Sequence, residues 1–156
     1  MPEPAADGPV DAAPIDRVRG QPSLRTVAMP ADTNPNGDIF GGWILAQMDI
    51  AGGTFAYHVA HGRVATVAVT GMVFHKPVTV GDEISIWCRT ERIGTTSITV
   101  LVEAWVRRRR LAIEEQVTEG LFTFVAIDEN GRPRPVRGTG TDFDAPDVDP
   151  RAEHRA

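Results

Sequence analysis

One carboxylate stands out in the long helical pattern of the sequence, because small residues surround it. Asp49 falls on a helical stripe with Leu45, Gly52, Gly53 and Ala56. Each glycine weakens a helix by about 1 kcal/mol relative to alanine, so the pair suggests that another backbone or a ligand approaches closely. A carboxylate beside a slender ligand could activate water or attack a carbonyl carbon. The stripe by itself nevertheless favours an ordinary helix carboxylate that faces solvent.

The start of the same helix offers a second chemical group. Gly41 and Gly42 open the pattern, and the first N–H groups of a helix lack an intrahelical acceptor and carry the positive end of its dipole. A carbonyl oxygen placed there would be stabilised as negative charge develops on it, and we predict the Gly42 N–H as the donor. The same glycines also permit a tight entry turn.

The loop before the helix holds two further candidates, Asn34 and Asp38, which could position water or the reacting group. Turn formation is the alternative role for Asn34. For Asp38 the alternative is capping of the helix or pairing with its dipole.

Composition limits the classes of protein that could carry these groups. The chain has 156 residues, enough for one domain, and its net charge of −5 argues against a general nucleic-acid binder. Cys88 is the single cysteine, so a reducing, cytoplasmic setting without disulfides is expected. No apolar run approaches the roughly 20 residues that cross a bilayer, and the N-terminus does not resemble a signal peptide. We therefore expect no membrane insertion.

The elements that must position these groups are one long helix and a series of strands. A helix is predicted over residues 42–60, where apolar residues recur at spacings of three and four: Ile44, Met48, Ala51, Phe55 and Val59. Strands are predicted over residues 24–29, 64–74, 83–92, 97–106 and 116–127. Because short turns join the last four strands, the sheet is expected to be antiparallel with the helix on one face, an α+β fold.

Two details of this reading concern burial and domain limits. Residues 64–74 are apolar on both faces, which predicts a buried central strand. Residues 1–20 and 137–156 are rich in Ala, Pro, Asp and Gly without periodicity, which predicts two disordered arms around a domain at residues 21–136.

A set of ordered motifs resembles the YciA-type acyl-CoA thioesterases, an ACOT-like hotdog thioesterase family. The resemblance begins with NPNGDIFGGW at residues 34–43 and QMD at residues 47–49. It continues over residues 24–26, 29–34, 61–64, 74–77, 80–82, 103–106 and 122–126, and so spans about residues 22–135. The departures are modest: Pro35 within the loop, His75 before Lys76, and the arginine run at residues 107–110.

The resemblance implies a hotdog fold, in which a five-stranded sheet wraps around one central helix. It implies hydrolysis of acyl-CoA to CoA and a free acid, with Asp49 as the catalytic carboxylate. It also implies a dimer with sites at the subunit interface, often assembled into a hexamer of three dimers. CoA is part of substrate and product, so no separate cofactor is expected. The chain lacks a Gly-x-Ser-x-Gly elbow, so the usual serine hydrolase route has no support.

The same resemblance suggests residues that bind the substrate. Phe40, Gly41 and Thr66 are assigned to the binding of substrate or CoA. The remaining candidates, Arg63, Lys76, Thr95, Thr96 and Ser97, are assigned to CoA. The two cations could meet phosphate, although such residues are commonly solvated surface charges. The last three could offer N–H and hydroxyl groups, or form an ordinary hairpin turn.

Other conspicuous residues receive structural interpretations. The arginine run at residues 107–110 is followed by glutamates and predicts a solvated hairpin or a subunit contact rather than a nucleic-acid site. The histidines lack metal-ligand spacing, so no metal is expected. Cys88 falls on an apolar strand face and is expected to be buried, and Trp105 is expected to contribute to packing.

Two other functions remain open at this point. A module that binds acyl-CoA without hydrolysing it would keep the fold and the CoA groove but would not need a carboxylate at Asp49. A hotdog dehydratase or hydratase would resemble a different pattern, with a histidine in the region of the catalytic helix, whereas His58 and His61 fall late in the predicted helix.

Overall fold

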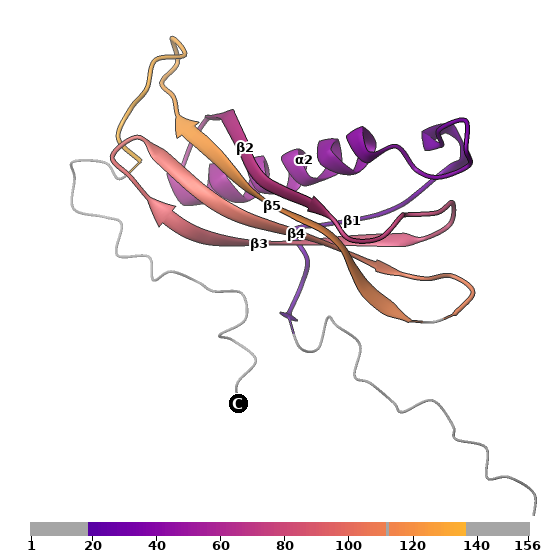
Figure 1. Ribbon diagram of the computed structural model, residues 1–156. Coiled ribbons are helices and arrows are strands. Elements are labelled where there is room, and N and C mark those ends of the chain that lie inside the picture. Colours follow the sequence, from indigo (N-terminus) through magenta and orange to yellow (C-terminus); the bar gives the residue numbers. More distant parts are fainter. Residues whose placement is uncertain (1–18, 112, 137–156) are drawn as a thin grey trace, which may run out of the picture.

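The computed structural model describes residues 19–111 and 113–136 (Figure 1). Most of the two arms predicted to be disordered, residues 1–18 and 137–156, lies outside the described residues. The elements are β1 (Leu24–Val27), the 3-10 turn η1 (Pro30–Asp32), α2 (Gly41–Ala60), β2 (Val64–Phe74), β3 (Glu83–Ile93), β4 (Ser97–Arg107) and β5 (Glu114–Ala126). The predicted helix and strands are therefore confirmed, with shifts of one or two residues at half of their ends.

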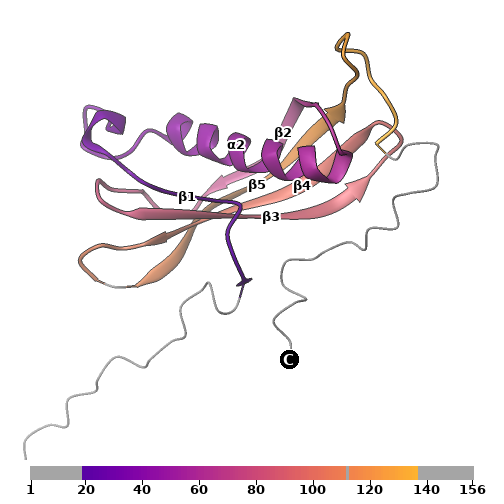
Figure 2. The same cartoon turned by 180° about the vertical axis from the view of Figure 1, so that it is seen from behind.

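The strands form one twisted antiparallel sheet in the order β1-β3-β4-β5-β2. The helix α2 lies across one face of this sheet, as Figures 1 and 2 show from opposite sides. The α+β arrangement expected from the sequence is thus confirmed. No helix in the described part of the chain is both long and apolar enough to cross a membrane.

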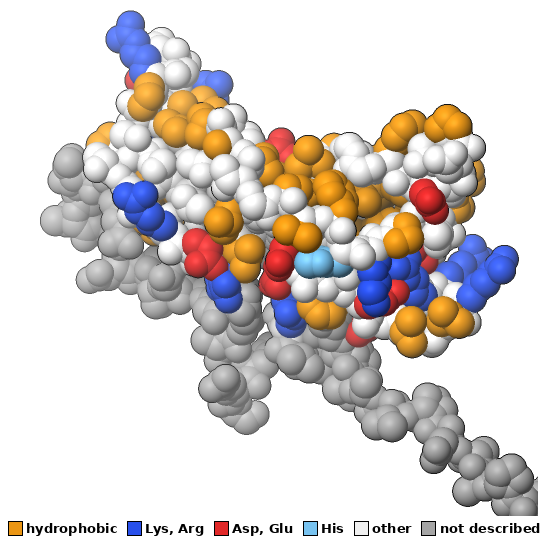
Figure 3. All heavy atoms as spheres, in the orientation of Figure 1, with side chains coloured by type: hydrophobic (Ala, Val, Ile, Leu, Met, Phe, Trp, Pro, Cys, Tyr) orange, Lys and Arg blue, Asp and Glu red, His pale blue; other side chains and the backbone are white. Residues whose placement is uncertain are grey.

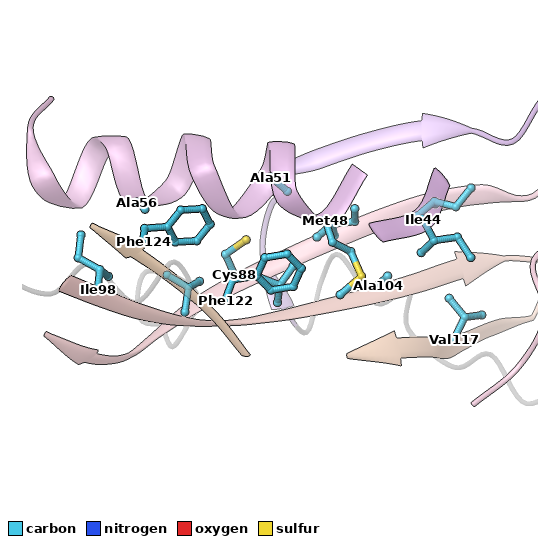
Figure 4. Close-up of a cluster of buried hydrophobic side chains, with 14 of the residues drawn as sticks. Ile44, Met48, Ala51, Ala56, Cys88, Ile98, Ala104, Val117, Phe122 and Phe124 are labelled. Carbon is cyan, nitrogen blue, oxygen red and sulfur yellow. The ribbon is translucent and has the colours of Figure 1, made fainter. Parts of the chain in front are cut away.

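The core lies between α2 and the inner face of the sheet. Alternate residues of β4 are buried as their pattern predicted, and Met48 and Ala56 of the helix share the buried cluster with Phe122 and Phe124 of β5 (Figure 4). Cys88 is buried in the same cluster, and this burial raises the pKa of its thiol to about 12. The thiol therefore stays protonated and behaves as a small apolar side chain.

The prediction of a buried central strand at residues 64–74 is wrong. β2 is an edge strand that pairs with β5 alone among the described strands, and most of its residues are exposed. Val67, Val73 and Phe74 are exposed by 57%, 45% and 52%. The apolar pattern correctly marked a strand, but the described part of the chain leaves most of that strand exposed.

The glycine pair of the helix also has a different cause from the one expected. A Cβ at Gly52 would lie 3.0 Å from Cζ of Phe124 and 3.2 Å from a methyl carbon of Val102. The close neighbour is therefore the core of the sheet rather than a ligand. Gly53 is less constrained, since its Cβ would meet the ring of Phe124 at an ordinary 3.7 Å.

This contrast gives a matched pair of stability predictions. We expect Gly52→Ala to lower the free energy of unfolding by about 1–3 kcal/mol, because the added methyl group overpacks the core. Gly53→Ala should leave stability unchanged or raise it by up to about 1 kcal/mol, since alanine favours the helix. Urea titrations followed by circular dichroism measure both. Equal effects of the two substitutions would contradict this account of the glycine pair.

The last two residues of the predicted N-terminal arm pack on the outer face of the sheet. The Arg19 guanidinium lies 4.5 Å from the centroid of the Trp105 ring and forms a 2.6 Å ion pair with Glu103. The carbonyl of Gly20 accepts a hydrogen bond from Nε1 of Trp87 at 3.2 Å. Arg19 and Gly20 therefore contact the sheet, and Trp105 serves packing as expected.

Candidate active site

The fold brings Asp49 of α2 against Thr66 of β2. The Thr66 hydroxyl donates a 2.7 Å hydrogen bond to Oδ1 of Asp49, although the residues come from different elements. Asp49 is half-buried and Thr66 is exposed. The bond fixes the direction of the carboxylate, and Oδ2 accepts no hydrogen bond from the described residues. One carboxylate oxygen is therefore oriented and the other is open to a water molecule or a substrate.

The start of α2 leaves two backbone donors available. The carbonyl of Phe40 accepts both the Trp43 and the Ile44 N–H, at 3.0 and 3.3 Å. The Phe40 side chain gives no cap hydrogen bond, and the N–H groups of Gly41 and Gly42 have no acceptor among the described residues. These N–H groups point outward along the helix axis, as an oxyanion site requires.

Neither packing nor backbone conformation within the chain requires a glycine at position 42. A Cβ at this position would meet no atom within 4 Å, and its backbone is not in the left-handed region. A glycine near the start of a helix that could hold alanine at no steric cost leaves open surface beside the free N–H groups. That surface fits a ligand or a second polypeptide chain.

The loop residues Asn34 and Asp38 serve the loop in this structure. Oδ1 of Asn34 accepts hydrogen bonds from the Asn36 N–H at 2.9 Å and the Asp38 N–H at 3.2 Å. The Asn34 N–H donates in turn to the Asp38 carbonyl at 2.7 Å. Asn34 thus forms the turn that leads into α2. The capping role considered for Asp38 is wrong, because the N-cap is Phe40 and no side chain caps the helix.

The predicted CoA-binding residues divide between the two ends of α2, which is 20 residues and hence about 30 Å long. At its start, the Phe74 ring lies against Gly41, and the Ile39 N–H donates to the Val78 carbonyl. Lys76 lies between Phe74 and Val78 in the sequence and is therefore at this end of the helix. At its other end, the Ile127 N–H donates to the carbonyl of Arg63. The turn of Thr95, Thr96 and Ser97 lies at the same end as Arg63, because the N–H of Ala126, next to Ile127, donates to the Thr96 carbonyl. One chain therefore does not gather the whole set.

Lys76 ends a chain of charged side chains. Its ammonium group is paired with Glu115, which also accepts a 2.8 Å hydrogen bond from Arg108. Arg108 reaches the buried Asp82 at 2.5 Å. Hydrogen bonds from Lys76, and then from Arg108, lower the pKa of Glu115. Arg108 is thus largely enclosed, which corrects the expectation of a solvated run, although Arg109 and Arg110 are exposed at the hairpin as predicted.

The two groups predicted to be catalytic are too far apart to act together within one chain. Asp49 and Gly42 lie on the same helix face, but seven residues at 1.5 Å each separate them by about 10 Å. The free N–H groups also point away from Asp49. A base or nucleophile must approach the reacting carbon to about 3–3.5 Å while the oxyanion lies about 3 Å from its donor. A single chain does not satisfy both conditions.

Two residues near the start of α2 were not predicted as site residues from the sequence. Phe74 was recognised only as part of a motif, and its contact with Gly41 depends on the pairing of β2. Glu115 gave no signal at all, because its link to Lys76 joins positions 39 residues apart in sequence. Within residues 19–111 and 113–136, His, Cys, Asp and Glu side chains form no group of three or more that could hold a metal ion.

Comparison with known proteins identifies the family. The model of the thioesterase superfamily matches residues 36–113. The acyl-CoA thioester hydrolase YciA of Salmonella typhimurium is 50% identical over 121 residues, which cover 76% of this chain and 91% of the relative. A solved variant of a hexameric broad-specificity acyl-coenzyme A thioesterase aligns with a TM-score of 0.74 at 42% identity, over 86% of this chain and 94% of that one.

A more distant solved protein shares the same fold. Variants of the acyl-CoA hydrolase from Staphylococcus aureus align with a TM-score of 0.66 at 26% identity, over 72% of this chain and 69% of theirs. The five-stranded sheet with one long helix is accordingly the hotdog fold. The chain belongs to the thioesterase superfamily, and within it to the family of YciA-type acyl-CoA thioester hydrolases.

Proposed function

We propose that this protein hydrolyses acyl-CoA thioesters to CoA and a free carboxylic acid, with Asp49 as the catalytic carboxylate. The observation that carries the proposal is the hydrogen bond from Thr66 to Asp49, which orients a carboxylate within the family motif. In the S. aureus hydrolase, an aspartate and a threonine 17 positions later were each replaced by alanine, and 17 positions also separate Asp49 from Thr66. The hexameric thioesterase was likewise solved with an aspartate replaced by alanine.

The reaction follows from the groups at the site. Asp49 either removes a proton from water as water attacks the thioester carbon, or attacks that carbon itself and is released by water in a second step. Negative charge develops on the carbonyl oxygen and is stabilised by N–H groups at the start of α2. The carbon–sulfur bond then breaks and the sulfur leaves as a thiolate. Since a free thiol has a pKa of about 8.5, the thiolate departs without a strong general acid.

A second copy of the chain would bring the two groups together. β2 is an 11-residue edge strand with exposed apolar side chains, and a strand of this kind readily pairs with its own copy. Hydrophobic side chains also gather over β2 and α2 on this face (Figure 3). Ile50 and Tyr57 of the helix are exposed apolar residues as well. Antiparallel pairing of β2 with its copy would bury this surface.

The same pairing would complete the site. In an antiparallel pair, the beginning of one strand lies beside the end of the other. Thr66, near the beginning of β2 and bonded to Asp49, would then lie close to Phe74 of the second copy, whose ring touches Gly41 of that copy. Asp49 of one copy would face the helix start of the other, and the divided CoA-binding residues would also be joined. Three such dimers would give a hexamer, as in the hexameric relative.

Release of free thiol from a panel of acyl-CoAs tests the activity. We expect the purified protein to release CoA thiol from several acyl-CoAs, measured with a thiol-reactive dye against a control without enzyme. If the protein binds acyl-CoA tightly and releases no thiol, it is a binding or sensing module and the proposed function is wrong.

A further inference from the structure

We propose that the Phe74 ring forms the wall that contacts the acyl group next to the thioester carbonyl, and so limits branching at its α-carbon. This inference rests on the proposed function, because it takes the helix start as the place where the carbonyl oxygen is held. Phe74 is the last residue of β2, and Cε1 and Cζ of its ring lie 3.4 Å from the position that a Cβ would occupy at Gly41.

Bond lengths place the ring within reach of the reacting group. A Cβ position lies about 2.5 Å from the nitrogen of its own residue, so the ring edge is within about 6 Å of the Gly41 nitrogen. A carbonyl oxygen bound there lies about 2.9 Å from that nitrogen, and the substituents of the carbonyl carbon lie about 2.4 Å further out. The ring edge and these substituents therefore lie at similar distances, about 6 and 5 Å, from the same nitrogen, which allows van der Waals contact where both lie on the same side of it.

Hydrogen bonds to β5 hold the backbone that carries the ring. Phe74 pairs with Thr118 of β5, and the neighbouring His75 N–H donates to the Val117 carbonyl at 2.7 Å. The hydroxyl of the buried Thr118 donates to the Val73 carbonyl at 2.6 Å. A ring held in this way acts as a fixed wall, because a bulky ligand cannot push the strand aside without breaking these bonds.

The chemistry of the wall favours the acyl side of the substrate. Phe74 is 52% exposed, and Phe40, which precedes the helix, is 50% exposed, so two phenyl rings present apolar surface next to the free N–H groups. The sulfur side of the thioester leads within two methylene groups to an amide, which needs hydrogen-bond partners that phenyl rings lack. An alkyl chain needs none. The rings therefore fit the first carbons of the acyl group.

The test compares straight and branched acyl groups of increasing bulk. Thiol release would be measured with butyryl-, isobutyryl- and pivaloyl-CoA for the wild type, Phe74→Leu and Phe74→Ala. We expect kcat/KM for isobutyryl-CoA relative to butyryl-CoA to rise roughly tenfold or more in Phe74→Ala, and less in Phe74→Leu, since a pocket discriminates one methyl group by about 10–200-fold. Val73→Ala, which also trims an exposed apolar residue of the same strand, should keep the wild-type ranking.

Several outcomes would overturn the proposal. An equal loss for every acyl group, or a loss that coincides with a changed oligomeric mass, would make Phe74 a structural or interface residue. A changed preference between CoA and N-acetylcysteamine thioesters of one acid, without a changed acyl preference, would place the ring on the sulfur side. Failure of the proposed function is distinguishable, because the wild type would then release no thiol from any substrate.

Discussion

Asp49→Ala is expected to lower kcat by about 10²–10⁴-fold, the range that a positioned general base contributes. KM should change little, because the substitution leaves the helix start and the CoA-binding residues intact. Asp49→Asn should be nearly as inactive, since an amide oxygen can still accept the hydrogen bond from Thr66 but cannot take a proton from water. Steady-state kinetics with butyryl-CoA, together with CoA binding by calorimetry, measures both effects.

Thr66 provides the matched control for this prediction. Thr66→Ala should reduce kcat less than Asp49→Ala does, because it removes only the hydrogen bond that orients the carboxylate. Thr66→Ser should recover much of the loss by restoring a hydroxyl donor. Full activity in Asp49→Asn would remove the carboxylate from the mechanism.

Gly42→Ala is expected to separate activity from stability. The added Cβ meets no atom of its own chain within 4 Å, so stability should stay constant or rise by up to about 1 kcal/mol. The kcat/KM should nevertheless fall by roughly 10–100-fold, because a methyl group beside the free N–H groups displaces the carbonyl from its position. Thermal unfolding and thiol release on the same preparations test this combination.

Gly53→Ala makes the same chemical change on the same helix, away from the helix start. It should keep the activity, so a general effect of altered helix propensity would appear in both variants. If Gly42→Ala retains full kcat/KM, the open surface at Gly42 does not receive the substrate, and the oxyanion must be held elsewhere.

The sequence predicted the elements well because their signals are local. The alternation in β4 depends only on which residues face a core, and the structure confirms it. The apolar stripe of α2 is confirmed in its first half, where Ile44, Met48 and Ala51 are buried; in its second half Phe55 and Val59 are half-buried, and the buried residues there are Gly52, Ala56 and Ala60. The error at β2 has a physical cause: an apolar pattern reports that a strand is covered, but it does not tell whether the same chain covers it. The glycine pair was misassigned for a related reason, because the ring of Phe124 is remote in sequence.

The site was predictable only in part. Asp49 and Gly42 could be selected from one helix, but the hydrogen bond from Thr66 depends on the placement of β2 beside α2. The contact of Phe74 with Gly41 depends on the same placement. The order of the motifs along the sequence could not show that Arg63 and Lys76 lie at opposite ends of α2, because sequence order does not give distances in space.

Complementation between two inactive variants tests most directly whether two copies share each site. Asp49→Ala and Gly42→Val chains, each carrying a different tag, would be produced together and the mixed assemblies purified through both tags. A mixed dimer has one site with both groups intact and one with both lost, so doubly tagged dimers should show about half of the wild-type thiol release, and doubly tagged hexamers of randomly mixed chains about a quarter. Each variant alone should remain inactive. Mixed assemblies that form in full yield and stay as inactive as their parents would contradict a site shared between two copies.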